Sequence, residues 1–163
     1  MALPEIPPGP DWVAAIIIES EAVLLMRYLG HGGRYYVLPS GTVEEDESLE
    51  AACLRCALEC IRRAADDYSR QLKVDLEGNQ AALTLGMKIG ELPWDTRGQR
   101  YHYFLAHGNR KSILSGPAMQ PRVPPDNPFW PIYEWISFAD LRAKHVSPID
   151  VSMCETARSK TLP

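Results

Sequence analysis

The sequence lacks the features that most readily identify nucleic-acid-binding, membrane-spanning and secreted proteins. Its 17 Lys and Arg residues are outnumbered by 21 Asp and Glu residues, so the net charge of −4 offers no basic face for general nucleic-acid binding. The longest apolar run, residues 12–18, is far too short to cross a bilayer. Residues 1–10 have no basic start and no apolar stretch of the kind that signal peptides carry, so we do not expect secretion or a membrane partner.

Cysteine is scarce as well, and its placement argues against disulfide bonds. The chain has four cysteines, and three of them (Cys53, Cys56 and Cys60) fall within one predicted helix, where neighbouring turns hold side chains together without closing a long loop. Secreted domains that depend on disulfides show a different pattern. We therefore predict reduced thiols and a cytoplasmic protein.

The pattern of apolar residues and turn residues predicts one α+β domain over residues 1–163. Runs rich in β-branched and aromatic residues predict six strands, at residues 12–18, 22–29, 34–38, 81–89, 101–107 and 132–137. Ser48 is expected to cap a helix that continues to about Asp67, and shorter helices are expected at 138–144 and from Pro148. The proline-dense stretch 115–131 predicts a long loop. This order predicts a central mixed sheet with helices on its faces.

The segment 41–63, GTVEEDESLEAACLRCALECIRR, carries most of the functional information. It starts with a glycine turn and an acidic cluster and continues as an amphipathic helix. On that helix Arg55 and Glu59 are four residues apart and share one broad face with Cys56 and Cys60. Acidic residues at a helix start are often only solvated, but carboxylates that converge in this way can also hold a hard cation such as Mg²⁺.

This segment resembles the box of the Nudix hydrolases, G-x5-E-x7-R-E-U-x-E-E-x-G-U, in which U is a bulky aliphatic residue. Gly41, Glu47, Arg55 and Glu59 match the box in register and without a gap. The sequences on either side of the box, YVLPSG before it and EWISFADL near the C-terminus, are similar to the family's strand that ends in Pro-Gly-Gly and to its closing strand and helix. The resemblance covers residues 12–143 and implies the family's fold, an α/β/α sandwich around a mixed sheet.

Within the box, the resemblance implies that Glu47 and Arg55 brace the loop and helix of the catalytic site and that Glu59 binds a metal. The chain departs from the box where it has Cys56 and Cys60 in place of two glutamates, and where it has two arginines at 62 and 63 in place of a glycine and an aliphatic residue. Thiols suit softer metals than Mg²⁺. The departures predict that canonical hydrolysis is lost or weakened.

An active protein would use Mg²⁺ or Mn²⁺ in a reduced site, and the candidate ligands come from a loop and the helix: Glu59, Glu47, Glu44 or Glu45, and the carbonyl of Ser40. The alternative for these groups is structural, with Glu47 and Glu59 as ion-pair partners of Arg55 and the loop acids in solvent. The cysteines likewise leave three interpretations open: a thiolate metal site, a catalytic thiol as in the isopentenyl diphosphate isomerases, or small hydrophobic side chains on a helix face.

Four residues outside the box are candidates for ligand binding: Arg27, Arg34, Trp94 and Arg97. The three arginines would border the pocket in this family and could bind phosphate, and Trp94, like Tyr35 and Trp130, could stack on a base. Solvation or packing is the alternative for each of them taken singly.

The sequence thus predicts a Nudix-fold protein that binds a small nucleotide-type ligand, a nucleoside diphosphate linked to another group. The alternative is an active, atypical Nudix pyrophosphohydrolase with a reduced metal site. A homodimer is compatible with either prediction.

Overall fold

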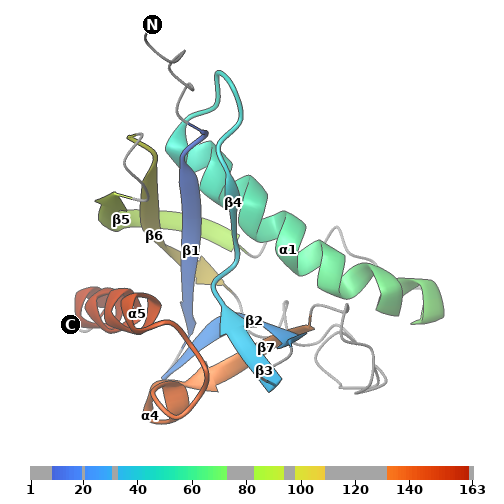
Figure 1. The fold of residues 1–163 in the computed structure, drawn as a ribbon. Helices are drawn as coiled ribbons and strands as arrows, with labels where there is room; N and C mark the ends of the chain where they lie inside the picture. Colours follow the sequence, from blue (N-terminus) through green and yellow to red (C-terminus); the bar gives the residue numbers. More distant parts are fainter. Residues whose placement is uncertain are drawn as a thin grey trace, which may run out of the picture.

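The computed structural model describes residues 9–19, 21–30, 33–72, 83–93, 98–108 and 132–161. In chain order, the strands are β1 (Trp12–Glu19), β2 (Ala22–Gly30), β3 (Gly33–Val37), β4 (Ser40–Thr42), β5 (Leu83–Pro93), β6 (Arg100–Gly108) and β7 (Ile132–Ser137). The helices are α1 (Leu49–Leu72), α4 (Phe138–Leu141) and α5 (Pro148–Thr161). The strands form one mixed sheet, and Figure 1 shows α1 and α5 on opposite sides of it, which confirms the predicted sandwich.

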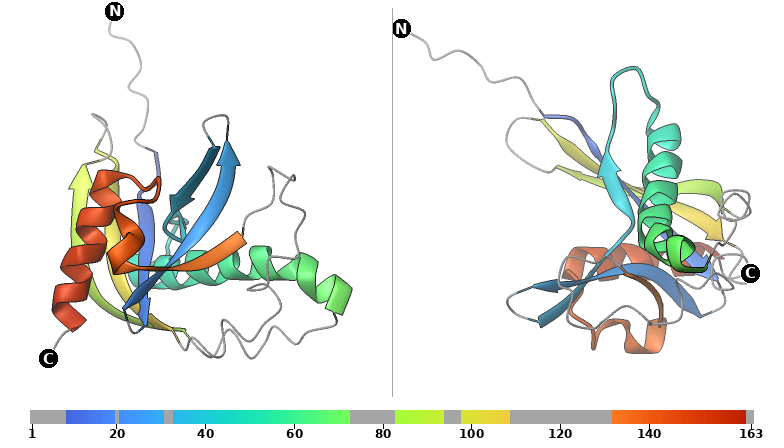
Figure 2. Two further views of the ribbon diagram at one scale, coloured as in Figure 1. Left: turned by 90° about the horizontal axis from the view of Figure 1, so that it is seen from below. Right: turned by 90° about the vertical axis from the view of Figure 1, so that its right-hand side faces the viewer.

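Strand β1 lies at the centre of the sheet and joins its two parts. On one side it pairs in parallel with β6, from Trp12 opposite Tyr101 to Ile18 opposite His107. On the other side it pairs with two strands in turn, with β4 near its start and with β2 at its end. Strand β2 also pairs with β3 and with β7. These three strands diverge from the part of the sheet that contains β5 and β6 (Figure 2).

The residues of β1 supply the core on both faces of the sheet because alternate side chains of a strand point to opposite faces. Val13, Ala15 and Ile17 pack on the α1 face with helix residues that include Cys53 and Cys56. Ala14, Ile16 and Ile18 pack on the α5 face with residues that include Val151 and Cys154. A strand that is buried on both faces reads as a continuous apolar run, which is what its sequence shows.

All six predicted strands are present, with small shifts at their ends, but β4 was not predicted. It has only three residues after Pro39, too few for a periodic pattern. Helix α1 continues to Leu72, beyond the expected end at about Asp67, in a chain that has Arg62 where the box has a glycine. Helix α4 is shorter than predicted, and α5 is a full helix of 14 residues.

The predicted loop at residues 115–131 lies outside the described residues. None of the described helices is both long enough and apolar enough to span a membrane.

Candidate functional site

The loop between β4 and α1 holds its acidic residues in a defined arrangement. The Glu44 N–H donates to Glu47 Oε1 at 3.0 Å, and the Glu47 N–H donates to the Glu44 carbonyl at 3.2 Å. Asp46 adopts a φ of 61°, a conformation that Asp tolerates better than most residues. Ser48 Oγ then accepts from the Ala51 N–H at 3.1 Å and caps α1, as predicted. These contacts fix Glu47 beside the first turns of the helix.

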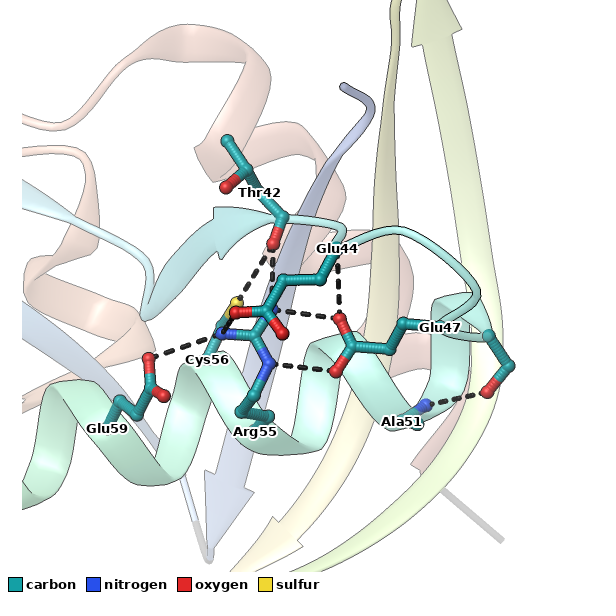
Figure 3. Close-up of polar contacts among 8 residues, drawn as sticks. Thr42, Glu44, Glu47, Ala51, Arg55, Cys56 and Glu59 are labelled. Carbon is teal, nitrogen blue, oxygen red and sulfur yellow. Dashed lines mark hydrogen bonds and ion pairs between the residues drawn. The ribbon is translucent and has the colours of Figure 1, made fainter.

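Arg55 is the centre of the site and links the helix to both the loop and β4 (Figure 3). Its Nε lies 2.8 Å from Glu47 Oε2 and its Nη2 lies 2.9 Å from Glu47 Oε1, a bidentate pair. Nη2 also donates to the Thr42 carbonyl at 2.8 Å. The hydrogen bonds from Arg55 lower the pKa of Glu47 from 4.5 to about 2, and those to Glu47 raise the pKa of Arg55. The pair is therefore charged throughout the physiological range.

Two further carboxylates approach the same guanidinium more loosely. Arg55 Nη1 lies 3.3 Å from Glu59 Oε2 and 3.6 Å from Glu44 Oε1. The side chains of Glu59 and Glu44 are 53% and 68% exposed, so water competes for both contacts. Three of the predicted site residues, Glu44, Glu47 and Glu59, thus do come together, and they do so around an arginine.

The two cysteines of the box point at β4, where the resemblance places metal-binding glutamates. Cys56 Sγ lies 3.8 Å from the Thr42 carbonyl oxygen, and Cys60 Sγ lies 3.5 Å from the Ser40 carbonyl oxygen. Cys56 is buried and Cys60 is half-buried. Burial raises the pKa of Cys56, so this thiol is neutral in the protein.

Gly41 allows this close approach between α1 and β4. A Cβ atom at position 41 would lie 2.6 Å from Cys56 Sγ and 3.2 Å from Cys56 Cβ, both closer than such contacts normally are. A glycine is therefore needed at this position for the space beside the helix and not for a positive φ.

The donors gathered here do not fit a hard divalent cation as they are arranged. Mg²⁺ is held by oxygen ligands, and here the helix offers two thiols. The Ser40 carbonyl faces the Cys60 thiol, and the carboxylates face Arg55. In the part of the chain that the structure describes, no group of three or more His, Cys, Asp and Glu side chains is placed to hold a metal ion. The predicted metal ligands therefore remain a prediction.

The other predicted ligand-binding residues have partners outside the Arg55 cluster, are exposed, or fall outside the described residues. Arg27, on β2, pairs with Glu134 of β7 at 3.3 Å, and Tyr36 donates to the same Glu134 oxygen at 3.4 Å. Arg34 is an exposed residue of β3. Tyr35, also on β3, is stacked on Tyr28 with ring centroids 5.5 Å apart. Trp94, Arg97 and Trp130 fall outside the described residues, and Glu45 is exposed in the loop.

Sequence reasoning missed Thr42 and Asp11, which connect the site to the sheet. The Thr42 carbonyl accepts from Arg55 and faces Cys56, but a backbone oxygen leaves no signal in a sequence. The Asp11 carbonyl accepts from the Val43 N–H at 2.9 Å, and its carboxylate lies 2.9 Å from His102 Nε2. His102 is 91 positions from Asp11, so only the pairing of β1 with β6 brings them together.

No family model matches the chain, and no curated protein matches its sequence. Several solved structures do match it over nearly their whole length. A NUDIX hydrolase from Nitrosomonas europaea is 20% identical with a TM-score of 0.56, and the match covers 95% of this chain and 90% of that one. A hydrolase of the NUDIX family from Clostridium perfringens is 20% identical with a TM-score of 0.55, covering 94% and 98% of the two chains.

An Ap4A hydrolase from C. elegans is also similar, at 14% identity and a TM-score of 0.54, with 93% of this chain and 97% of that chain covered. At these identities the likeness concerns the fold. The chain has the Nudix fold.

Proposed function

From this fold, we propose that the protein binds a small nucleotide-type molecule, a nucleoside diphosphate linked to another group, and that its canonical Mg²⁺-dependent hydrolysis is lost or weakened. One observation carries the proposal. Cys56 and Cys60 direct their sulfur atoms at the Thr42 and Ser40 carbonyls, in the position where the Nudix box has glutamates.

The chemistry of the substitution supports a loss of metal affinity. Each Glu-to-Cys replacement removes one negative charge and two hard oxygen donors, and a thiol that stays protonated offers little in return. Here the loss affects two positions on consecutive turns, and the remaining carboxylates are already paired with Arg55. A Mg²⁺ ion bridging a diphosphate would therefore be held by few protein ligands.

The bracing residues of the box support continued ligand binding. Glu47 and Arg55 keep their bidentate contact, and Arg55 keeps its bond to the strand that borders the site. These contacts hold the loop and β4 against α1, so the framework that would border a ligand is in place. The binding pocket is thus the part of the family function that we expect to persist.

The alternative, an atypical hydrolase with a reduced metal site, is favoured by the positions of Glu44 and Glu59. Both approach the same nitrogen of Arg55 and both are more than half exposed, so a divalent cation could compete with the arginine for them. Mg²⁺ or Mn²⁺ would then be held by Glu59, Glu44, Glu47 and the Ser40 carbonyl. This requires Cys60 to release that carbonyl.

The proposal also concerns the binding partners of the protein and its location in the cell. The ligand is a small molecule, and neither a nucleic acid nor a membrane is required. Four free thiols, three of them buried, are consistent with the reducing cytoplasm. A homodimer would leave the proposal unchanged.

The test is a screen of nucleoside di- and triphosphates, ADP-ribose and dinucleotide polyphosphates, with Mg²⁺ or Mn²⁺, for turnover and for thermal stabilisation. We expect stabilisation by at least one compound without turnover. Metal-dependent turnover that Glu59→Gln abolishes, and that Glu50→Gln on the same helix does not, would establish the hydrolase instead. Absence of both stabilisation and turnover across the screen would reject the binding proposal.

A restoration variant tests the alignment with the box. Cys56→Glu combined with Cys60→Glu should increase the affinity for Mg²⁺, measured by calorimetry. Cys56 is buried, so the new glutamate is expected to lower stability without metal and to recover part of it when Mg²⁺ is added. No gain in Mg²⁺ affinity would show that these positions do not face the metal site.

A further inference from the structure

The thiols of Cys56 and Cys60 form a pair whose geometry differs from that of a redox pair. Both lie on the side of α1 that faces β4, one helical turn apart, and their sulfur atoms approach carbonyl oxygens two residues apart on the same strand. Residues four apart on a helix have Cβ atoms about 5–6 Å apart. A disulfide requires about 3.5–4.5 Å, so the helix disfavours a bond between these two sulfur atoms.

The same separation suits a bridging ion. Metal–thiolate bonds are about 2.3 Å long, so two thiolates on opposite sides of one ion lie about 4.6 Å apart, which side chains on Cβ atoms about 5–6 Å apart can reach. Soft thiolate ligands select soft d¹⁰ cations such as Cu(I). Such cations accept two-coordinate linear geometry, so the lack of a third Cys, His or carboxylate ligand among the described residues is no obstacle.

We propose that Cys56 and Cys60 form a two-thiolate site for a soft monovalent d¹⁰ cation, Cu(I) or a chemical equivalent, in place of the hard-cation site of the box. Binding is a ligand exchange in which two S–M bonds form and two thiol protons pass to solvent. No electron is transferred. The proposal concerns the metal alone and does not depend on nucleotide binding.

Charged groups already surround the pair before an ion binds. Two thiolates and one monovalent cation carry a net charge of −1. The Arg55 guanidinium bonds to the same Thr42 carbonyl that Cys56 faces, but it is paired with Glu47 and lies near Glu44 and Glu59, so it does not offset this charge in full. The Ser40 and Thr42 carbonyls lose their thiol donors, and their negative ends then face the cation. Cys60 is only half-buried and gives access from solvent.

Two other cysteines provide matched controls. Cys53 lies on the same helix but is fully in the core, and Cys154 is buried on the opposite face of the sheet, under α5. Cys→Ala at each of the four positions removes the thiol and keeps good helix propensity. Far-ultraviolet circular dichroism and thermal unfolding of the metal-free variants would show that each one folds.

The experiment titrates the reduced protein with Cu(I) held by a chromophoric chelator, and with Ag(I) as a redox-stable substitute. We expect one ion per chain, with thiolate-to-metal absorption in the ultraviolet. Cys56→Ala and Cys60→Ala should each weaken binding at least about 100-fold, whereas Cys53→Ala and Cys154→Ala should leave it within about threefold. A site that survives both Cys56→Ala and Cys60→Ala, or that requires Cys154, would overturn the proposal, as would the absence of stoichiometric binding.

The metal titration and the nucleotide screen together separate this proposal from the proposed function. A protein that binds nucleotides but no Cu(I) or Ag(I) rejects only the thiolate site. A protein that binds Cu(I) through Cys56 and Cys60 but no nucleotide rejects only the proposed function.

Discussion

Helix α1 carries two neighbouring clusters that meet the same short strand in different ways. The first cluster is ionic, because Arg55 joins Glu47 to the Thr42 carbonyl through direct, well-formed hydrogen bonds. The second is weaker, because Cys56 and Cys60 offer only weak S–H donors to the Thr42 and Ser40 carbonyls. Both attach α1 to β4, within two turns of each other.

The difference separates two roles that the Nudix box combines. The ionic cluster keeps the residues that brace the loop against the helix, and in this chain it still forms that structure. The thiol pair stands where the resemblance places metal-binding glutamates, and it packs against β4. We expect the stability of the fold to depend more on the first cluster than on the second.

The largest effect should come from removing the centre of the ionic cluster. Arg55→Ala leaves the Glu47 carboxylate and the Thr42 carbonyl without their donor, and we expect a loss of about 2 kcal/mol in the free energy of unfolding. The free energy of unfolding of Arg55→Lys should lie between those of the wild type and Arg55→Ala, since lysine keeps the charge and loses the bidentate geometry. Urea unfolding measures both variants.

The control for this prediction is an arginine in a single exposed ion pair. Arg142 lies 2.7 Å from Glu155, and its side chain is 74% exposed. Arg142→Ala should cost less than about 0.5 kcal/mol. Equal losses for Arg55→Ala and Arg142→Ala would contradict the bracing role of Arg55.

A smaller effect is expected where the thiol pair meets the strand. Gly41→Ala places a methyl group against Cys56 and should cost about 1 kcal/mol through overpacking. Cys56→Ala removes the closer of the two contacts, so the cost of Gly41→Ala should fall in the double variant. A double-mutant cycle by urea unfolding measures this coupling. Additive losses would mean that the glycine and the thiol do not interact.

The smallest effect should appear in the dependence of stability on pH. The pKa of Glu47 is lowered from 4.5 to about 2 in the folded protein. The contribution of the ionised Glu47 to the free energy of unfolding is therefore complete above pH 4.5 and is lost as the pH falls towards 2. Glu47→Gln should lack this component, so its unfolding curves should converge with those of the wild type as the pH is lowered over this interval. A constant difference across the interval would assign the effect of the substitution to something other than the charge.

Much of the fold was predictable from local pattern. The β-branched run of β1, the cap at Ser48 and the periodicity of α1 each depend on residues within a few positions of one another. The contact of Arg55 with Glu59 was predictable for the same reason, whereas its contact with Glu47, eight positions away, was expected from the resemblance. Strand β4 was not, because three residues carry no period and its place depends on pairing with β1.

The contacts of the site beyond the helix depend on tertiary structure. Arg27 remains a candidate phosphate ligand, and the structure adds a partner that the sequence did not indicate, Glu134 of β7, because β2 pairs with β7. The pairing of Asp11 with His102 depends on the parallel register of β1 and β6. Sequence spacing cannot supply such information because strand register is set by the whole sheet.

The sequence by itself determined which side chains of the segment 41–63 share a face of the helix, because helical geometry repeats every 3.6 residues whatever the surroundings. It also determined that two expected carboxylates are thiols. Only the tertiary structure decided what these groups face. The docking of α1 on β4 directs the thiols at backbone carbonyls and gathers the remaining carboxylates around Arg55, since those partners come from a strand that the helix meets only when the sheet has formed.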